Sequence, residues 1–187
     1  MDKLRDSAVE TVAELKKHRI RTEMITGDNE SVAKVIAKKL GMDEYHAGLL
    51  PEGKVDVIET HSKNDSGIAM VGDGVNDAPA LVRANVGIAM GAIGSDAALE
   101  TANVALMKDD LSKIPYLIRL SKKALGLVKK NIAASILVKG ALAVLVFPGL
   151  VTLWLAVAVG DMGLSLAVIA NAMRLSLLKP EEKANLK

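Results

Sequence analysis

Two carboxylates that follow an apolar segment are the residues best suited to chemistry in this sequence. Asp73 and Asp77 stand four positions apart, directly after the apolar run of residues 68–71 and beside glycines that permit a tight turn. Hard oxygen ligands at the end of a strand suit Mg²⁺. An Asx-rich turn, with Asp77 capping a helix that starts near Ala78, explains the same residues. The carboxylates alone therefore leave a magnesium site and a structural turn both open.

A second pair of charged residues lies in an otherwise apolar segment. Residues 132–173 contain only two charged side chains, Lys139 and Asp161. A charge at bilayer depth costs about 2.5 to 3.5 kcal/mol on insertion scales, so each residue is a candidate for a functional role. Two antiparallel helices would bring them to similar depth, where they can pair. A purely structural salt bridge between the helices is the alternative.

The elements that must position the first pair alternate between helix and strand. Helices are predicted over residues 6–18, 29–40, 51–62, 78–84 and 111–130, and strands over residues 21–26, 67–71 and 86–90, with 104–108 as a further candidate. Aromatic residues make up only 2% of the chain, which favours close-packed helices and parallel strands over an antiparallel sandwich. The pattern predicts an α/β fold with a doubly wound parallel sheet, whose ligands bind at the carboxyl ends of the strands.

Residues 132–173 predict a pair of membrane helices. A membrane helix needs roughly 20 apolar residues, and the Pro148-Gly149 pair divides the segment into a short first span and a longer second one. Basic residues flank the segment on both sides and its turn is uncharged, so the positive-inside rule places both ends in the cytoplasm. A buried hairpin in a soluble protein is the alternative.

The charge balance and the cysteine count exclude several kinds of site. Residues 1–131 hold 19 basic and 19 acidic side chains, which leaves 5 and 3 of the totals of 24 and 22 for the remainder. No polybasic surface for nucleic acid follows from this balance. Because the chain has no cysteine, disulfides are excluded and any thiolate metal ligands must come from another segment.

The string of residues 72–81, Gly-Asp-Gly-Val-Asn-Asp-Ala-Pro-Ala-Leu, resembles the hinge motif of P-type ATPases. Two further elements stand in the order that this family and its parent group, the haloacid-dehalogenase-like phosphotransferases, require. They are the Thr26-Gly27-Asp28 motif, after the first predicted strand, and Lys54. Taken singly, the first is a common strand-to-helix turn and the second an ordinary exposed lysine. The ensemble carries the resemblance, which implies a partial haloacid-dehalogenase-like, Rossmann-type phosphorylation domain.

The resemblance also implies a role for each of these residues. Asp73 would ligate Mg²⁺, and Asn76 and Asp77 would complete the metal and phosphate shell. Thr26, within its Thr-Gly-Asp motif, would hydrogen-bond the phosphoryl oxygens, and Lys54 would neutralise their charge. These roles make physical sense, because phosphoryl transfer is catalysed mostly by positioning and charge neutralisation.

The apolar segment sharpens the resemblance. Residues 131–139, together with Asp161-Met162-Gly163, Asn171 and Arg174, look like the last two membrane helices of the zinc, cadmium and lead branch of heavy-metal pumps. In that branch the Asp contributes to the intramembrane metal site and the Lys is its counter-charge, which assigns these roles to Asp161 and Lys139. The motifs of the copper and cobalt branches do not occur in these helices. The Met162 side chain points to a different helical face and is not counted as a ligand.

The three histidines, His18, His46 and His61, show no partner spacing typical of a metal site. We interpret them as surface residues.

The family's Asp-Lys-Thr-Gly-Thr nucleophile, nucleotide-binding domain and Cys-Pro-Cys helix do not occur in the 187 residues. We therefore expect no phosphoenzyme from this chain alone, and a partner that supplies these parts. The predicted organisation is a partial phosphorylation domain (residues 1–120), a stalk (121–131), a transmembrane hairpin (132–174) and a cytoplasmic tail (175–187). The expected location is the plasma membrane, in a multi-pass protein.

The sequence thus predicts part of an ATP-driven exporter of Zn²⁺, Cd²⁺ or Pb²⁺ that uses Mg²⁺ as cofactor and ATP as substrate, with lipid but no nucleic acid as partner. A membrane-anchored module that binds Mg²⁺ and phosphate, and that regulates or complements a full-length pump, is the alternative. A soluble phosphatase of the same superfamily is a third interpretation, disfavoured by the hairpin. The pattern does not distinguish zinc, cadmium, lead and cobalt as cargo.

Overall fold

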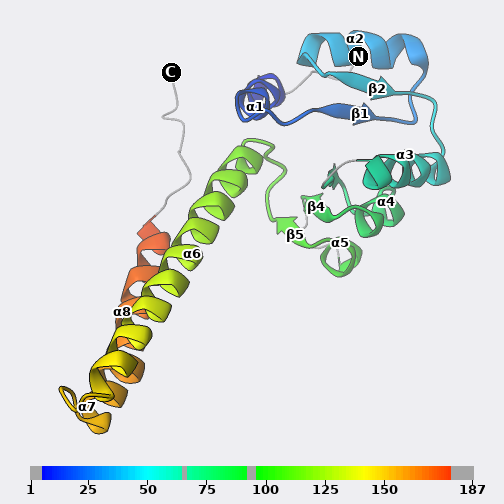
Figure 1. The fold of residues 1–187 in the computed structure, drawn as a ribbon. Helices are drawn as coiled ribbons and strands as arrows, with labels where there is room; N and C mark the ends of the chain where they lie inside the picture. The colour runs from blue at the N-terminus through cyan, green and yellow to red at the C-terminus, as the bar shows by residue number, and fades with distance from the viewer. Residues whose placement is uncertain (1–5, 65–66, 92–95, 178–187) are drawn as a thin grey trace. The chain divides into compact units, whose positions relative to one another are not determined.

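Two units make up the chain, Met1–Pro115 and Tyr116–Lys187. The structure, a computed structural model, describes residues 6–64, 67–91 and 96–177. In the first unit, helices and strands alternate along the chain (Figure 1). Its helices are α1 (Asp6–Lys17), α2 (Glu30–Leu40), α3 (Pro51–Asn64), α4 (Ala78–Arg83) and α5 (Asp96–Thr101). Its strands are β1 (Glu23–Ile25), β2 (Glu44–His46), β3 (Ala69–Gly72), β4 (Val86–Met90) and β5 (Val104–Leu106).

Every strand pairing in the described residues is parallel, which confirms the predicted α/β class. The strands form two sheets, however, where the sequence predicts one. In the smaller sheet β1 pairs with β2, and Ile25 is opposite His46. In the larger sheet β4 lies between β3 and β5. The strand β2 and the helix α5 are additional to the predicted elements, whereas the other predicted elements of this unit agree with the structure to within a few residues at their ends.

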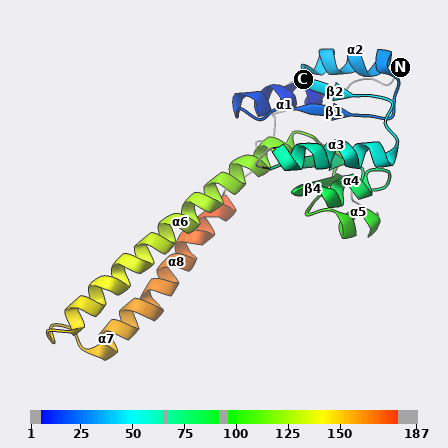
Figure 2. The same ribbon diagram turned by 45° about the vertical axis from the view of Figure 1, so that its right-hand side comes forward.

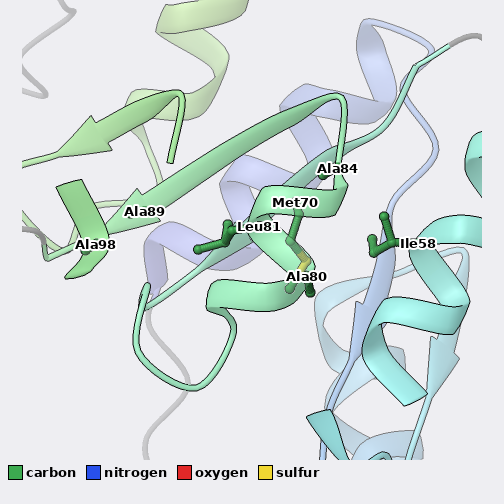
Figure 3. Packing of buried hydrophobic residues seen from close by; sticks show 7 residues of the cluster. All are labelled: Ile58, Met70, Ala80, Leu81, Ala84, Ala89 and Ala98. Atoms are coloured by element: carbon green, nitrogen blue, oxygen red, sulfur yellow. The ribbon is translucent and has the colours of Figure 1, made fainter. Parts of the chain in front are cut away.

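The core of the first unit is built from small and medium apolar side chains. A buried cluster joins α3, β3, α4, β4 and α5, and Figure 3 shows its residues Ile58, Met70, Ala80, Leu81, Ala84, Ala89 and Ala98. Leu81 of α4 is completely buried among them. Because Ile25 of β1 packs against the same cluster, α3 also covers one face of the smaller sheet. This packing fixes α3, which carries Lys54, and α4, which directly follows the loop of Asp73 and Asp77.

The second unit is a helical hairpin. The long helix α6 (Lys113–Val146) is followed by a turn at Pro148-Gly149 and then by α7 (Leu153–Val157), the π-helical segment η1 (Ala158–Gly163), α8 (Leu164–Met173) and the 3-10 turn η2 (Arg174–Leu177). Figures 1 and 2 show α8 lying beside part of the longer helix α6. The turn lies at the predicted break, where Gly149 has a φ of 78°.

One of the described helical segments is long and apolar enough to cross a membrane, Leu153–Ser176, with 24 residues. At 1.5 Å per residue such a helix is about 36 Å long, which exceeds the roughly 30 Å of a bilayer core. The apolar part of α6 is shorter and continues from a lysine-rich stretch, so α6 does not meet the same criterion. The helical hairpin is therefore present, while a membrane-crossing role for its first helix stays a prediction.

Candidate functional site

The loop between β3 and α4 organises its first carboxylate through the backbone. The N–H groups of Val75 and Asn76 donate to Oδ1 of Asp73 at 2.9 and 3.1 Å. These bonds, led by the one from Val75, hold the pKa of the Asp73 carboxyl below its usual value. Asp73 thus stays ionised at neutral pH on the exposed side of the loop. The hydrogen bonds form the turn that the structural interpretation predicts, and they also fix the carboxylate at the end of β3.

Two glycines let the loop close this tightly. A Cβ at position 72 would lie only 2.6 Å from Oδ2 of Asp77, so only glycine leaves room for that carboxylate above the end of β3. Gly74 has a φ of 77°, a left-handed conformation that side chains rarely adopt, and its Cα faces the Cβ of Ala98. The absence of a side chain at position 72 therefore leaves a space at the end of β3, and Oδ2 of Asp77 occupies it.

The second carboxylate does not cap the helix. Asp77 stands at the N-cap position of α4, but its side chain makes no cap hydrogen bond. Its Oδ1 instead accepts from Nζ of Lys54 at 2.6 Å, and both side chains are largely covered, with 16% and 17% exposure for Lys54 and Asp77. Interpreting Lys54 as an ordinary exposed lysine is therefore wrong. The ion pair brings α3 and the β3–α4 loop together.

The Thr26-Gly27-Asp28 turn follows β1 and is closed on itself. The Thr26 hydroxyl donates to the Asp28 carboxylate and accepts from the Asp28 N–H, both at 3.1 Å. Asn29 then caps α2 by accepting from the Val32 N–H at 3.0 Å. The structure thus supports a strand-to-helix turn here. The hydroxyl group of Thr26 bonds within its own turn and not to the loop of Asp73 and Asp77.

The charged residues of the hairpin meet each other. Nζ of Lys139 on α6 lies 2.7 Å from Oδ1 of Asp161 in η1, with side chains 56% and 63% exposed. Further along, the Asn171 amide donates to Oδ1 of Asn131 at 2.8 Å. Lys139 follows Asn131 along α6, whereas its partner Asp161 precedes Asn171 on the second helix. This reversed order is the one that antiparallel helices require. The pairing of Lys139 and Asp161 predicted from their depth is present.

The helical backbone is irregular at the second charge. Asp161 lies in a π-helical segment, a distortion that often marks functional positions. The buried Gly160 lies beside it, and a Cβ there would lie 3.0 Å from the Leu142 side chain of α6. A hollow of about 390 Å³ adjoins this point and is lined by residues that include Ser135, Lys139, Gly160 and Ser165. Lys139 and two serines therefore line this hollow together with apolar residues of α8.

The histidines depart from the surface interpretation. Nε2 of His61 lies 3.1 Å and Nε2 of His46 3.4 Å from Oε2 of Glu23. These side chains are between 17% and 27% exposed. His18 lies elsewhere, near Glu14. Two of the three histidines therefore converge on one carboxylate, which sequence spacing did not indicate.

Comparisons with known proteins place this geometry in context. Residues 1–85 match the family model of haloacid dehalogenase-like hydrolases. Over 179 residues the chain is 45% identical to a probable cadmium-transporting ATPase of Listeria monocytogenes, covering 95% of this chain and 25% of that protein. It is 44% identical over 178 residues to a zinc-transporting ATPase of Synechocystis, covering 94% of this chain and 24% of that protein.

A solved structure agrees with both matches. The crystal structure of a zinc-transporting PIB-type ATPase in its E2·Pi state superposes with a TM-score of 0.85 at 41% identity, over 94% of this chain and 28% of that one. The chain is therefore homologous, over nearly its whole length, to cadmium- and zinc-transporting P-type ATPases, and it contains a haloacid-dehalogenase-like region. It spans about a quarter of the length of the relatives it matches.

Proposed function

We propose that this chain is part of an ATP-driven pump for zinc or cadmium ions, to which it contributes a magnesium-binding and phosphate-contacting loop and an intramembrane carboxylate. The observation that carries the proposal is the pair of Lys–Asp contacts, one beside the β3–α4 loop and one within an apolar hairpin. The homology over 95% of the chain supports it. Lead as a further cargo remains a prediction from resemblance.

The residues of the loop fit a magnesium ion. Asp73 is held ionised by backbone N–H groups, and Oδ2 of Asp77 fills the recess above Gly72. Together with the amide oxygen of Asn76 they offer hard oxygen donors, which Mg²⁺ prefers. Bound Mg²⁺ would supply charge neutralisation to a phosphoryl group.

The remaining residues of the site would position a phosphoryl group. Lys54 is held by Asp77, so its ammonium group stands at this loop as a fixed positive charge. The Thr26 hydroxyl, which now bonds to Asp28, would turn to the phosphoryl oxygens, and Gly27 allows the close turn there. Orientation and fixed charges of this kind account for most of the catalysis of phosphoryl transfer.

The sheets are consistent with a missing partner segment. Within the described residues β1 has β2 as its one strand neighbour and β3 has β4. The motifs of Thr26 and Asp73 follow these two strands. By resemblance the strand that leads to the nucleophile lies centrally in such a sheet, and the open edges of β1 and β3 supply backbone groups to which it can bond. A segment carrying that strand is the proposed partner.

The hairpin carries the transport part of the proposal. In a bilayer, the exposed pair of Lys139 and Asp161 would be costly against lipid, so other helices of the pump are expected to cover it. Asp161 is the only carboxylate of the segment 132–173 and would bind the transported ion. Lys139 would take its place at Asp161 once the ion has left. The proposed setting is a multi-pass protein of the plasma membrane with both ends of the hairpin in the cytoplasm.

A chimera tests the proposed function. The first three quarters of a cadmium-transporting relative would be joined to residues 1–187, and ATP hydrolysis would be measured with and without Cd²⁺ or Zn²⁺. We expect metal-stimulated hydrolysis and an acid-stable phosphoenzyme, both abolished by Asp73→Asn because an amide replaces an anionic Mg²⁺ ligand. Size-exclusion chromatography reports assembly. A monodisperse chimera without metal stimulation would contradict the proposal.

A further inference from the structure

We propose that Glu23, His46 and His61 form a binding site for a divalent transition-metal ion of the Zn²⁺ class. The three residues come from β1, β2 and α3, which belong to one unit. Their potential ligand atoms all lie within 4.8 Å of one another. The site is separate from the loop of Asp73 and Asp77 and from the hairpin.

The fold brings the three side chains together from distant parts of the sequence. Because side chains alternate along a strand, Glu23 and Ile25 share one face of β1, and His46, opposite Ile25, belongs to the same face of the sheet. Ile25 packs against the cluster that contains Ile58 of α3. His61 follows Ile58 by three residues, on the same side of that helix. The convergence therefore results from core packing and not from a flexible surface.

Two of the three distances in the cluster match those between ligands of a tetrahedral metal ion. Zinc bonds to imidazole nitrogen and carboxylate oxygen are about 2.0–2.2 Å long, so two ligand atoms of one tetrahedral ion lie about 3.3 Å apart. The separations from Oε2 of Glu23 are 3.1 Å to Nε2 of His61 and 3.4 Å to Nε2 of His46. Two imidazoles and one carboxylate are also a donor set found in zinc sites that keep a fourth position open.

Nε2 of His46 adds a second observation. This nitrogen is buried and makes no hydrogen bond to any described residue, a property that it shares with Nε2 of His18 outside the cluster. A buried polar atom without a partner carries a desolvation penalty of about 1–3 kcal/mol, so such atoms call for an explanation. A metal ion between His46 and Glu23 would satisfy it, whereas a hydrogen bond to Glu23 does not form at the observed geometry.

The neighbouring charges favour a cation. The guanidinium group of Arg21 holds Oε1 of Glu23 at 3.0 Å and also contacts the carboxylate of Glu44. This contact orients Glu23 and leaves its Oε2 to the two imidazoles. Oε1 of Glu44 lies 3.8 Å from Nε2 of His46 and provides further negative charge. Two carboxylates against one guanidinium leave the site with a net negative charge when the imidazoles are neutral.

Metal binding at Glu23, His46 and His61 does not depend on the proposed pump function. If that function is also correct, the ion belongs to the class that the pump carries, and the site would allow the cytoplasmic unit to respond to it. Only this response rests on the proposed function, so the experiment below measures binding by the 187-residue chain itself.

The full chain, purified in detergent, would be titrated with Zn²⁺ in the presence of excess Mg²⁺, which occupies sites made of hard oxygens. His61→Gln is expected to weaken zinc binding at least tenfold, since a loss of this size already follows the removal of groups that only support metal ligands. The matched control is His18→Gln, which removes a histidine outside the cluster. Equal zinc affinities of His61→Gln and His18→Gln would overturn the proposal.

A second measurement needs no substitution and therefore does not depend on how a variant folds. In wild-type chain with ¹⁵N-labelled histidine, Zn²⁺ is expected to shift the ring nitrogen resonances of His46 and His61 and to leave those of His18 in place. Co²⁺ should give the visible absorption bands of a four-coordinate site. Unchanged His46 and His61 resonances at saturating zinc would contradict the site.

Discussion

Two Lys–Asp ion pairs have nearly equal nitrogen–oxygen distances but lie in different units of this molecule. Lys54 and Asp77 are 2.6 Å apart, and Lys139 and Asp161 are 2.7 Å apart. The first pair is more than four-fifths covered by its own unit, while the side chains of the second are more than half exposed on the hairpin. Distance alone therefore does not reveal what an ion pair does.

The surroundings decide the energetic role of each pair. An exposed pair in water contributes at most about 1 kcal/mol, and a charge at bilayer depth costs about 2.5 to 3.5 kcal/mol. The pair of the hairpin is thus a poor device for stability in either setting, which favours a functional role for Asp161. The covered pair of Lys54 and Asp77 holds α3 to the β3–α4 loop, and the charge of each residue compensates that of the other. The predictions below separate these roles.

The largest effect is expected at the hairpin pair. In the assembled chimera, Asp161→Ala should reduce zinc-stimulated ATP hydrolysis to the level measured without metal, because a divalent ion in hydrocarbon needs an anionic ligand and this segment offers one carboxylate. The apolar double variant Lys139→Met with Asp161→Leu should fold, since replacing a buried ion pair by hydrophobic residues is often neutral or stabilising. It should remain inactive.

A charge reversal sharpens this test. Lys139→Asp with Asp161→Lys keeps a salt bridge between the helices and moves the carboxylate to the other helix. We expect this variant to stay without zinc stimulation. Near-normal stimulation in the apolar double variant would instead identify the pair as a structural bridge.

A smaller but substantial effect is expected at the covered pair. Lys54→Met in the chimera should lower the rate of phosphorylation by about 100-fold, the size expected when one fixed charge-stabilising group is removed from a reaction centre. Lys63→Met is the matched control, because Lys63 is an exposed lysine of the same helix. Quench-flow measurement of the phosphoenzyme would decide. Equal rates in the two variants would leave Lys54 as a structural partner of Asp77.

Local patterns in the sequence account for most of the elements around the site. The apolar runs that form β3 and β4 and the stop at Gly41 after α2 depend on neighbouring residues, so their positions agree with the prediction. The strand β2 escaped prediction because Glu44-Tyr45-His46 is short and polar. Its extended form follows from pairing with β1, which is a contact between distant residues.

The candidate site likewise combines features that the sequence predicts with contacts that only the fold reveals. The order of Thr26, Lys54 and Asp73 indicated a phosphoryl-transfer site through family resemblance, but the contact between Lys54 and Asp77 depends on how α3 packs against α4. The cluster at Glu23 is equally non-local. His46 and His61 are fifteen positions apart and form no motif, so only the sheet register and the helix packing show that they meet.

The smallest effect is expected at a third Lys–Asp pair, which tests what such a pair contributes when it is neither covered nor in the hairpin. Lys16 lies 2.8 Å from Asp43, with both side chains partly exposed. The hydrogen bond from Lys16, followed by those from the N–H and hydroxyl groups of Thr22, lowers the pKa of Asp43 from its usual 3.8 to about 2. A folded-state pKa below the unfolded one means that the ionised carboxylate stabilises the fold above about pH 4, and that this contribution disappears as the pH falls toward 2.

Asp43→Asn should therefore lower the melting temperature of the chain slightly at pH 6 and leave it unchanged near pH 2. Glu52→Gln, at another exposed acidic residue, should show no such difference. A melting temperature for Asp43→Asn equal to wild type at pH 6 would mean that the exposed pair contributes nothing, and that close geometry in this molecule matters only where the surroundings remove water.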